Sequence, residues 1–298
     1  MADVVVVGAG IIGLTAAVRL RAAGFDVVVW SPVDPLDTVS AVAAAVWYPT
    51  RTDYDPRVLA WAGETYAEFT RQARDGVPGI LLRPTRNLGT ATEMPWWAVA
   101  AGDVAIVDGE VRFTAPLVEM TTYLPWLRDQ VHFVRRGVDR LEDAFAAAPI
   151  VVNATGLAAR ELAADPAVHP ARGQIVLVAN PGIETSVRAA GKPSTYVHPR
   201  SRDVVLGGTF EEGVWATAPD PAIRDAILVR CRALVPELAR APIVGEKVGL
   251  RPVRRGGPRV AAEAVPGGTI VHAYGHGGAG VTLSWGCAGE IVRLCGAR

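Results

Sequence analysis

The first thirty residues contain the pattern that most restricts how this chain can fold. Residues 4–7 are four consecutive valines, which is typical of a parallel strand buried on both faces. A segment with apolar residues at helical spacing follows and ends at Gly24, and residues 27–30 form a second apolar run. Strand, helix and strand in this order predict a βαβ unit at the start of an α/β domain.

A glycine-rich turn separates the first strand from the helix. Its sequence, GAGIIG at residues 8–13, is the G-x-G-x-x-G pattern of dinucleotide-binding proteins. The first glycine permits a tight turn, the second lets a pyrophosphate approach the backbone, and the third lets helix and strand pack closely. Because the motif directly follows a predicted buried strand, it strongly indicates that the chain binds a dinucleotide. The residues expected at this contact are Gly8, Gly10, Ile11, Ile12 and Gly13.

The end of the second strand departs from the usual nicotinamide pattern. A carboxylate there would bind the ribose hydroxyls, but Trp30 is followed by Ser31 and Pro32. The first acid is Asp34, in the following loop, and it is the candidate for this contact. The missing acid weakens a nicotinamide interpretation more than a flavin interpretation, since flavin sites use other contacts.

Length and charge restrict the possible partners. With 298 residues, of which 50% are hydrophobic, the chain can bury a large core in one large domain or two ordinary ones. Thirty basic residues balance thirty acidic ones, so charge gives no reason to expect a nucleic acid or a membrane as partner. Cys231, Cys287 and Cys295 form no pattern typical of a disulfide framework or a zinc site.

We expect the protein in the cytoplasm. The apolar run over residues 4–18 is too short to cross a bilayer and is interrupted by glycines. It also lacks the basic segment and the cleavage site of a signal peptide.

The remaining segments predict two interleaved domains. We expect helices over residues 51–76, 123–131 and 281–295, strands over 148–154, 173–178, 248–253 and 269–273, and a hairpin from 194–198 and 204–206. The strand over 148–154 ends in Ala-Thr-Gly, where Gly156 offers either a plain turn or a second close approach to the dinucleotide. Nucleotide-binding pieces therefore occur at the start, in the middle and at the end of the chain.

Segments along nearly the whole chain resemble the D-amino-acid oxidase family of flavoproteins. These segments are VVVVGAGIIGL at 4–14, VAAAVWYP at 42–49, YLPWL at 123–127, VVNATG at 151–156, RGQIVLV at 172–178, YVHP with VVLGGTF at 196–210, GLRPVR at 249–254 and YGHGGAGVTLSWGCA at 274–288. The last two are the most specific. The resemblance implies a mixed α/β (α+β) protein, in which a Rossmann-like FAD-binding domain of glutathione-reductase type is interleaved with a substrate domain on a large mixed β-sheet.

The resemblance also implies where FAD binds without a covalent bond. We assign residues 1–50, 132–178 and 255–298 to the FAD-binding domain, and 51–131 and 179–254 to the substrate domain. The glycines after residue 274 would let backbone lie against the flavin ring, and the last helix would point its positive end at it. Beyond the first turn, the implied FAD contacts are Ser40, Ala45, Val46, Gly156, Gly277, Gly280, Val281 and Thr282.

Four residues are implied at the substrate. Arg251 matches the arginine that binds the substrate carboxylate, and Tyr196 matches the tyrosine whose hydroxyl shares it. The Gly278 carbonyl would accept from the amine, and Tyr48 would line the pocket. The implied reaction moves a hydride from Cα of a D-amino acid to the flavin, so no residue is expected to act as acid or base. With O₂ it yields a 2-oxo acid, ammonia and hydrogen peroxide.

Two positions depart from the family pattern. Family members from eukaryotes carry a tyrosine on a lid loop before the Tyr196 position, whereas residues 186–195 are short and contain none, so we expect a more open site. Thr50 stands where an aromatic pocket residue is common, which leaves the side-chain preference open.

The residues also leave competing functions open. One is that of a related flavin oxidase, acting on glycine, sarcosine or acidic D-amino acids, and another is that of a dehydrogenase with an acceptor different from O₂. An oxidase for acidic substrates needs a second cation in the pocket, and we disfavour it because Arg200 and Arg202 are expected on a hairpin turn. A nicotinamide-dependent enzyme and a non-catalytic FAD-binding protein complete the range of functions. We also disfavour metal binding by His272 and His276, which lie at a strand-to-loop junction. For the assembly, a dimer is the expectation.

Overall fold

The computed structural model describes residues 1–49, 52, 55–191 and 193–296, so Thr50 lies outside the described residues. Six strands of this part form one sheet, in the order β14-β15-β7-β1-β2-β6. They are β1 Val4–Val7, β2 Val27–Ser31, β6 His132–Arg135, β7 Ile150–Asn153, β14 Arg259–Val265 and β15 Gly268–Tyr274. All neighbours are parallel except β14 and β15. The valines of β1 lie near the centre of the sheet and are fully buried, as a strand covered on both faces requires.

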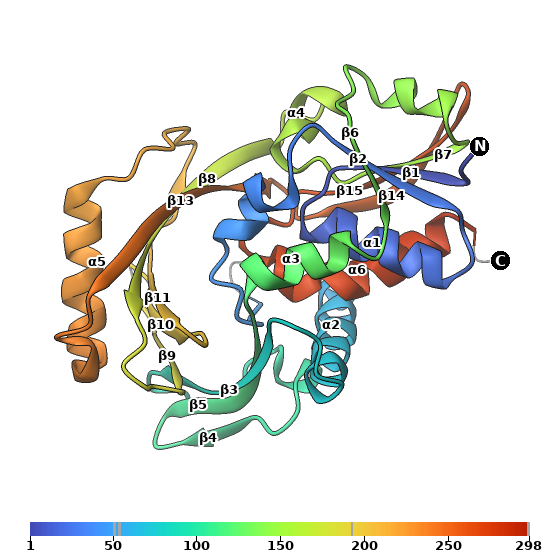
Figure 1. The fold of residues 1–298 in the computed structure, drawn as a ribbon. Helices are drawn as coiled ribbons and strands as arrows, with labels where there is room; N and C mark the ends of the chain where they lie inside the picture. The colour runs from blue at the N-terminus through green and yellow to red at the C-terminus, as the bar shows by residue number, and fades with distance from the viewer. Residues whose placement is uncertain (50–51, 53–54, 192, 297–298) are drawn as a thin grey trace.

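Helices cover one face of this sheet. Figure 1 shows α1 (Ile11–Ala22), α3 (Met120–Arg128) and α6 (Gly280–Leu294) close together beneath the strands. α1 packs against α6, and α2 (Pro56–Arg74) also packs against α6. Across the described ranges, no helix combines the length and the hydrophobicity that a bilayer crossing needs.

Nine further strands of the described chain form a second sheet. Its order is β12-β8-β11-β10-β9-β3-β5-β4, with β13 paired to β8. The strands are β3 Ile80–Leu88, β4 Ala105–Val107, β5 Glu110–Val118, β8 Val168–Ala179, β9 Ser186–Ala189, β10 Thr195–Pro199, β11 Asp203–Gly207, β12 Glu211–Glu212 and β13 Ile243–Arg254. The sheet is mixed, because β3 pairs with β9 in parallel while the other pairs are antiparallel. α5 (Pro221–Leu234) packs on its outer face, and the short α4 (Ala159–Leu162) precedes β8.

β8 and β13 connect the two sheets. They pair antiparallel over almost their whole length, from Val168 opposite Arg254 to Val178 opposite Ile243. In Figure 1 these long strands run from the second sheet toward the first. The sequence places residues 168–178 in the FAD-binding domain, whereas β8 hydrogen-bonds with β11 and β13 in the nine-stranded sheet. The division into domains otherwise stays a prediction.

Several predicted elements have different ends. The helix expected over residues 51–76 begins at Pro56, because the Asp55 side chain accepts from the Arg57 N–H and caps it. The helix expected over 123–131 begins three residues earlier, at Met120, and ends at Arg128. The predicted hairpin is β10 paired with β11. Arg200 lies on the turn of this hairpin, as expected, and its buried side chain donates to the Ala43 carbonyl (3.1 Å).

A buried chain of hydrogen bonds joins three helices. The Tyr123 hydroxyl on α3 donates to the Gln72 side-chain carbonyl on α2 (2.7 Å). The same hydroxyl accepts from the Trp285 indole N–H on α6 (3.0 Å). All three side chains are at most 2% exposed, so water cannot replace either partner.

Replacing Tyr123 by Phe should lower the free energy of unfolding by about 1–3 kcal/mol, because the Gln72 and Trp285 polar groups would stay buried without this partner. Urea unfolding followed by circular dichroism measures the loss. Tyr66→Phe is the matched control, since the partly buried Tyr66 hydroxyl donates to the Thr114 carbonyl (2.8 Å) where water can replace it, so its loss should cost less. Equal losses in the two variants would contradict this account.

Candidate active site

A cavity of about 700 Å³ lies between the two sheets. Its walls come from the ends of β1 and β7, the start of α1, the segment before α2, the nine-stranded sheet and the start of α6. Ligand cavities in proteins measure roughly 300–1,000 Å³, so this one suits a large ligand. Its lining includes these predicted residues: Gly8, Gly10, Ile11, Ile12, Ser40, Ala45, Val46, Tyr48, Gly156, Tyr196, Arg251, Gly277, Gly278, Gly280, Val281 and Thr282.

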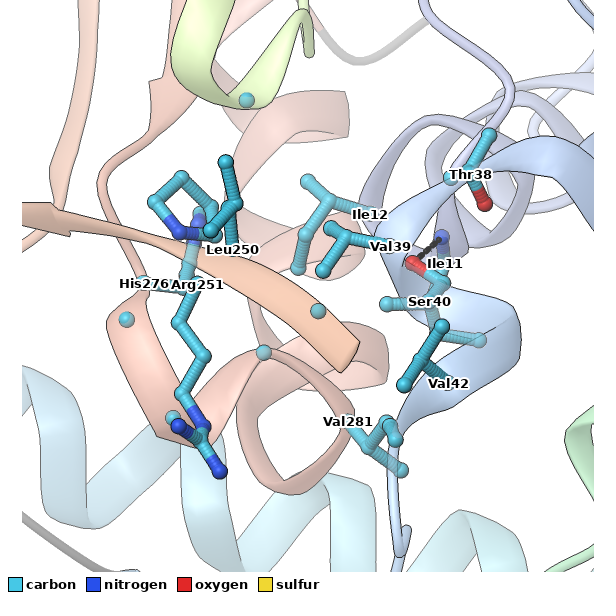
Figure 2. A pocket seen from close by; sticks show the side chains of 18 of the residues that line it. Ile11, Ile12, Thr38, Val39, Ser40, Val42, Leu250, Arg251, His276 and Val281 are labelled. Atoms are coloured by element: carbon cyan, nitrogen blue, oxygen red, sulfur yellow. Dashed lines mark hydrogen bonds between the residues drawn. The ribbon is translucent and has the colours of Figure 1, made fainter. Parts of the chain in front are cut away.

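The first wall is the turn between β1 and α1. Gly8 has a φ of +115°, and a Cβ there would collide with the Ala154 carbonyl. Gly13 lies outside the lining, where a Cβ would collide with the Gly8 carbonyl. The Ile11 N–H donates to the Ser40 hydroxyl (2.9 Å), as Figure 2 shows. Among the described residues, only this serine is a side-chain partner of the N-terminus of α1, which opens onto the cavity and suits a pyrophosphate.

The loops after β7 and β2 lie beside this turn. The Asn153 side chain accepts from the Thr155 hydroxyl (2.7 Å) and fixes the bend that leads to Gly156. Asp34 is not among the residues that line the cavity, and its carboxylate caps a 3₁₀ turn by accepting from the Leu36 N–H (3.0 Å). The acid that does line the cavity at this end is Asp37, which the sequence did not single out.

The glycines before α6 form the opposite wall. Gly275 and Gly277 have φ values of +82° and +55°. α6 then begins at Gly280 with no side-chain cap, so its first N–H groups and the positive end of its dipole face the cavity. The Thr282 hydroxyl donates to the Tyr48 carbonyl (3.0 Å) and accepts from its N–H (3.2 Å), which ties this wall to the segment before α2.

Arg251 and Tyr196 meet on the nine-stranded sheet. Figure 2 shows Arg251 extending from β13 on one side of the cavity, across from Val39, Ser40 and Val42. One nitrogen of its guanidinium donates to the Thr209 carbonyl (3.1 Å). Burial raises the pKa of Tyr196, while the nearby charges of Arg251 and Arg188 lower it in part. The phenol therefore stays protonated and able to donate.

Arg188 is another cavity residue that the sequence analysis did not single out. Its guanidinium carbon lies 4.2 Å from the centre of the Tyr48 ring and 5.6 Å from that of Tyr196. All three residues line the cavity. A second cation therefore lines the cavity, whereas the sequence analysis considered only Arg200 and Arg202 for this role. The register of β9 against β10, which no local pattern encodes, places Arg188 opposite Tyr196.

Both histidines near the last turn have other partners. His272 bonds to the Asn153 side chain (3.2 Å) and to Glu263 (3.1 Å). His276 lies 3.4 Å from the Cys287 sulfur, and burial lowers its pKa to about 4, so the imidazole is neutral. Within the described ranges no group of side chains could hold a metal ion.

A βαβ unit with a glycine turn, opening on a large cavity between two sheets, is the arrangement of a dinucleotide-binding enzyme. Comparison with known proteins identifies the family of this enzyme. The model of the DAO family, described as FAD dependent oxidoreductase, matches residues 3–120 and 109–294. The chain belongs to this family, and FAD is its cofactor.

Full-length relatives agree with this assignment. The chain is 47% identical to a D-amino-acid oxidase of Rubrobacter xylanophilus, over 100% of this chain and 97% of the relative. It is 43% identical to a D-amino-acid oxidase of Streptomyces coelicolor, over 98% and 96%. The crystal structure of glycine oxidase from Bacillus cereus matches the fold with a TM-score of 0.83 at 17% identity, over 99% of this chain and 97% of that one.

Gly10 allows a test of the FAD wall. Its φ of −75° suits any residue, and a Cβ there would lie 3.1 Å from the Ser40 hydroxyl, at the start of α1. Gly10→Ala should weaken FAD binding about 10-fold or more, because the methyl group takes space at the phosphate contact. Fluorescence titration of the apoprotein with FAD measures this. Gly89→Ala is the control, since a Cβ at Gly89 meets nothing within 4 Å. Unchanged affinity in Gly10→Ala would remove Gly10 from the site.

Proposed function

We propose that this FAD-dependent oxidoreductase oxidises D-amino acids to 2-oxo acids and ammonia, with O₂ as the electron acceptor and hydrogen peroxide as the other product. The observation that supports it most is the pairing of Arg251 with Tyr196 on one wall of a cavity whose other walls suit FAD. The preference for the D-enantiomer is taken from the two relatives named as D-amino-acid oxidases. The cytoplasm as compartment is part of this proposal.

Arg251 and Tyr196 would hold the substrate by its carboxylate. A guanidinium presents its N–H donors as a planar fork, which matches the two oxygens of a carboxylate. The protonated Tyr196 hydroxyl adds a third donor from β10. Fixing the carboxylate at these points orients Cα, and orientation of this kind contributes much of the rate in enzymes.

The remaining lining residues exclude water and hold the amine. The Gly278 carbonyl is the acceptor that we assign to the amine. When bound, FAD supplies the two-electron acceptor for oxidation of the Cα–N bond. Among the described lining residues Asp37 is the one carboxylate, and it comes from the nucleotide end. Its position agrees with a reaction in which no side chain removes a proton from Cα.

Anaerobic mixing of the purified yellow protein with D-amino acids should bleach the flavin absorbance, whereas L-amino acids should leave it unchanged. Admission of air should restore the colour and release one hydrogen peroxide for each substrate oxidised. Bleaching by neither enantiomer would overturn the proposal. Bleaching followed by slow reoxidation in air would identify a dehydrogenase with another electron acceptor.

Arg251→Ala should raise KM for the amino acid roughly 10- to 100-fold while FAD stays bound, because the carboxylate loses a charge-assisted pair of hydrogen bonds. Steady-state kinetics and the flavin-to-protein absorbance ratio measure the two effects. Arg255→Ala is the matched control, since exposed Arg255 directly follows β13 and does not line the cavity. An unchanged KM in Arg251→Ala would exclude this residue from substrate binding.

A further inference from the structure

A buried thiol and a buried imidazole meet behind the glycine-rich turn that precedes α6. The Nε2 atom of His276 lies 3.4 Å from the Cys287 sulfur. Cys287 is fully buried, and His276 is 6% exposed. His276 opens the 3₁₀ turn Gly277–Ala279, whereas Cys287 lies about two helical turns inside α6. The contact therefore ties the turn to the body of the helix that follows it.

Both groups of this pair are uncharged. Burial lowers the pKa of His276 to about 4, so its imidazole is neutral at neutral pH. Burial also raises the pKa of the Cys287 thiol well above its usual range, so the thiol keeps its proton. A thiol can donate its proton, and the unprotonated nitrogen of a neutral imidazole accepts. The contact therefore fits a hydrogen bond from the thiol to Nε2, with the ring proton on Nδ1.

His276 supplies the side chain that anchors this turn. Among residues 275–278 it is the one residue that is not a glycine, and glycine backbone is the least restricted of all. The His276 backbone pairs with Val253 of β13, and its carbonyl accepts from the Ala279 N–H (3.0 Å). These backbone contacts fix the turn to β13 and to itself. The contact with Cys287 adds a side-chain connection to α6.

Both the turn and the start of α6 face the cavity that suits FAD. Gly277, Gly278 and Gly280 line it, whereas Cys287 is not among its described lining residues. The positive end of a helix dipole stabilises negative charge nearby, and a flavin takes up electrons when it is reduced. A shift of the turn relative to α6 would therefore change the fit of the ring and the stabilisation of its reduced form.

We propose that Cys287 and His276 are positioning residues for FAD, whose thiol–imidazole hydrogen bond holds the glycine turn against α6. The bond acts on the affinity for FAD and on the reduction potential of the bound flavin. It does so through the position of the turn, without contact between the thiol and the cofactor. This inference concerns the cofactor alone and does not depend on which substrate is oxidised.

Cys287→Ala should weaken FAD binding about 10-fold, because the turn loses its connection to the helix. It should also weaken the preference for reduced flavin about 10-fold, which makes the two-electron potential about 30 mV more negative. Cys287→Ser keeps a donor on a side chain of similar shape and should restore the affinity to within about 2-fold. Fluorescence titration of the apoprotein with FAD measures the affinity, and equilibration of the holoprotein with a redox dye measures the potential.

The serine variant separates the hydrogen bond from simple packing. If Cys287 only filled space, a buried serine would harm the protein at least as much as alanine. Cys287→Val fills the space without a donor, so it should show the alanine defect even where the cavity left by alanine impairs folding. Serine and valine variants that bind FAD equally well would overturn the inference.

A double-mutant cycle tests whether the two side chains act through one contact. His276→Leu removes the acceptor and should weaken FAD binding about as much as Cys287→Ala does. Because both changes break the same bond, the double variant should lose no more affinity than the worse single variant. Additive losses would show that the two side chains act separately and would refute the pairing.

Cys231→Ala is the matched control. Cys231 is as fully buried as Cys287, its sulfur lies 3.5 and 3.6 Å from two backbone carbonyls, and it is not among the described lining residues. Its replacement should leave the affinity for FAD and the flavin potential unchanged. Equal effects of Cys231→Ala and Cys287→Ala would mean that loss of any buried thiol loosens the site, and the proposed role of Cys287 would fail.

Discussion

The antiparallel pairing of β8 with β13 is the constraint on which the rest of the site depends. It carries Arg251 to a position opposite Ala171, next to Gly173. A Cβ on Gly173 would collide with the Arg251 guanidinium, so the glycine gives the side chain its course along the sheet. The same two strands reach the parallel sheet at their other end. One continuous ladder therefore fixes the distance between the walls that suit FAD and the wall that would bind a substrate.

Contacts at the far end of β13 explain much of the glycine-rich turn before α6. Val253 pairs with His276, and a Cβ on Gly275 would lie 2.6 Å from the Cβ of Arg254. The Arg254 guanidinium in turn donates to Asp165 (2.7 Å), which also accepts from the Tyr274 hydroxyl (2.9 Å). Part of the bare backbone is therefore required by the strand that passes behind it. The remaining glycines face the cavity.

The parts of this molecule that local sequence encodes were predictable. The valine strand, its glycine turn and the following helix need only neighbouring residues, and the structure has them at 4–22. The resemblance to the family predicted Arg251 and Tyr196 at the substrate, and both line the cavity. Their roles stay predictions. Arg188 was missed because a strand arginine has a meaning only once its pairing partner is known, and that partner is fixed by a register between strands. The buried state of Arg200 depends on the Ala43 carbonyl, which lies far away in the sequence.

The electrostatics of the substrate wall also explain why a phenol is useful there. Two guanidinium groups near Tyr196 lower its pKa, and burial raises it by more, so the hydroxyl keeps its proton. A deprotonated tyrosine would repel a carboxylate and would neutralise one of the arginines. A bound carboxylate would raise the pKa of Tyr196 further, since a like charge disfavours the phenolate. Burial of the ring thus keeps two positive charges and a neutral donor together in one small wall, which is the combination that a substrate carboxylate needs.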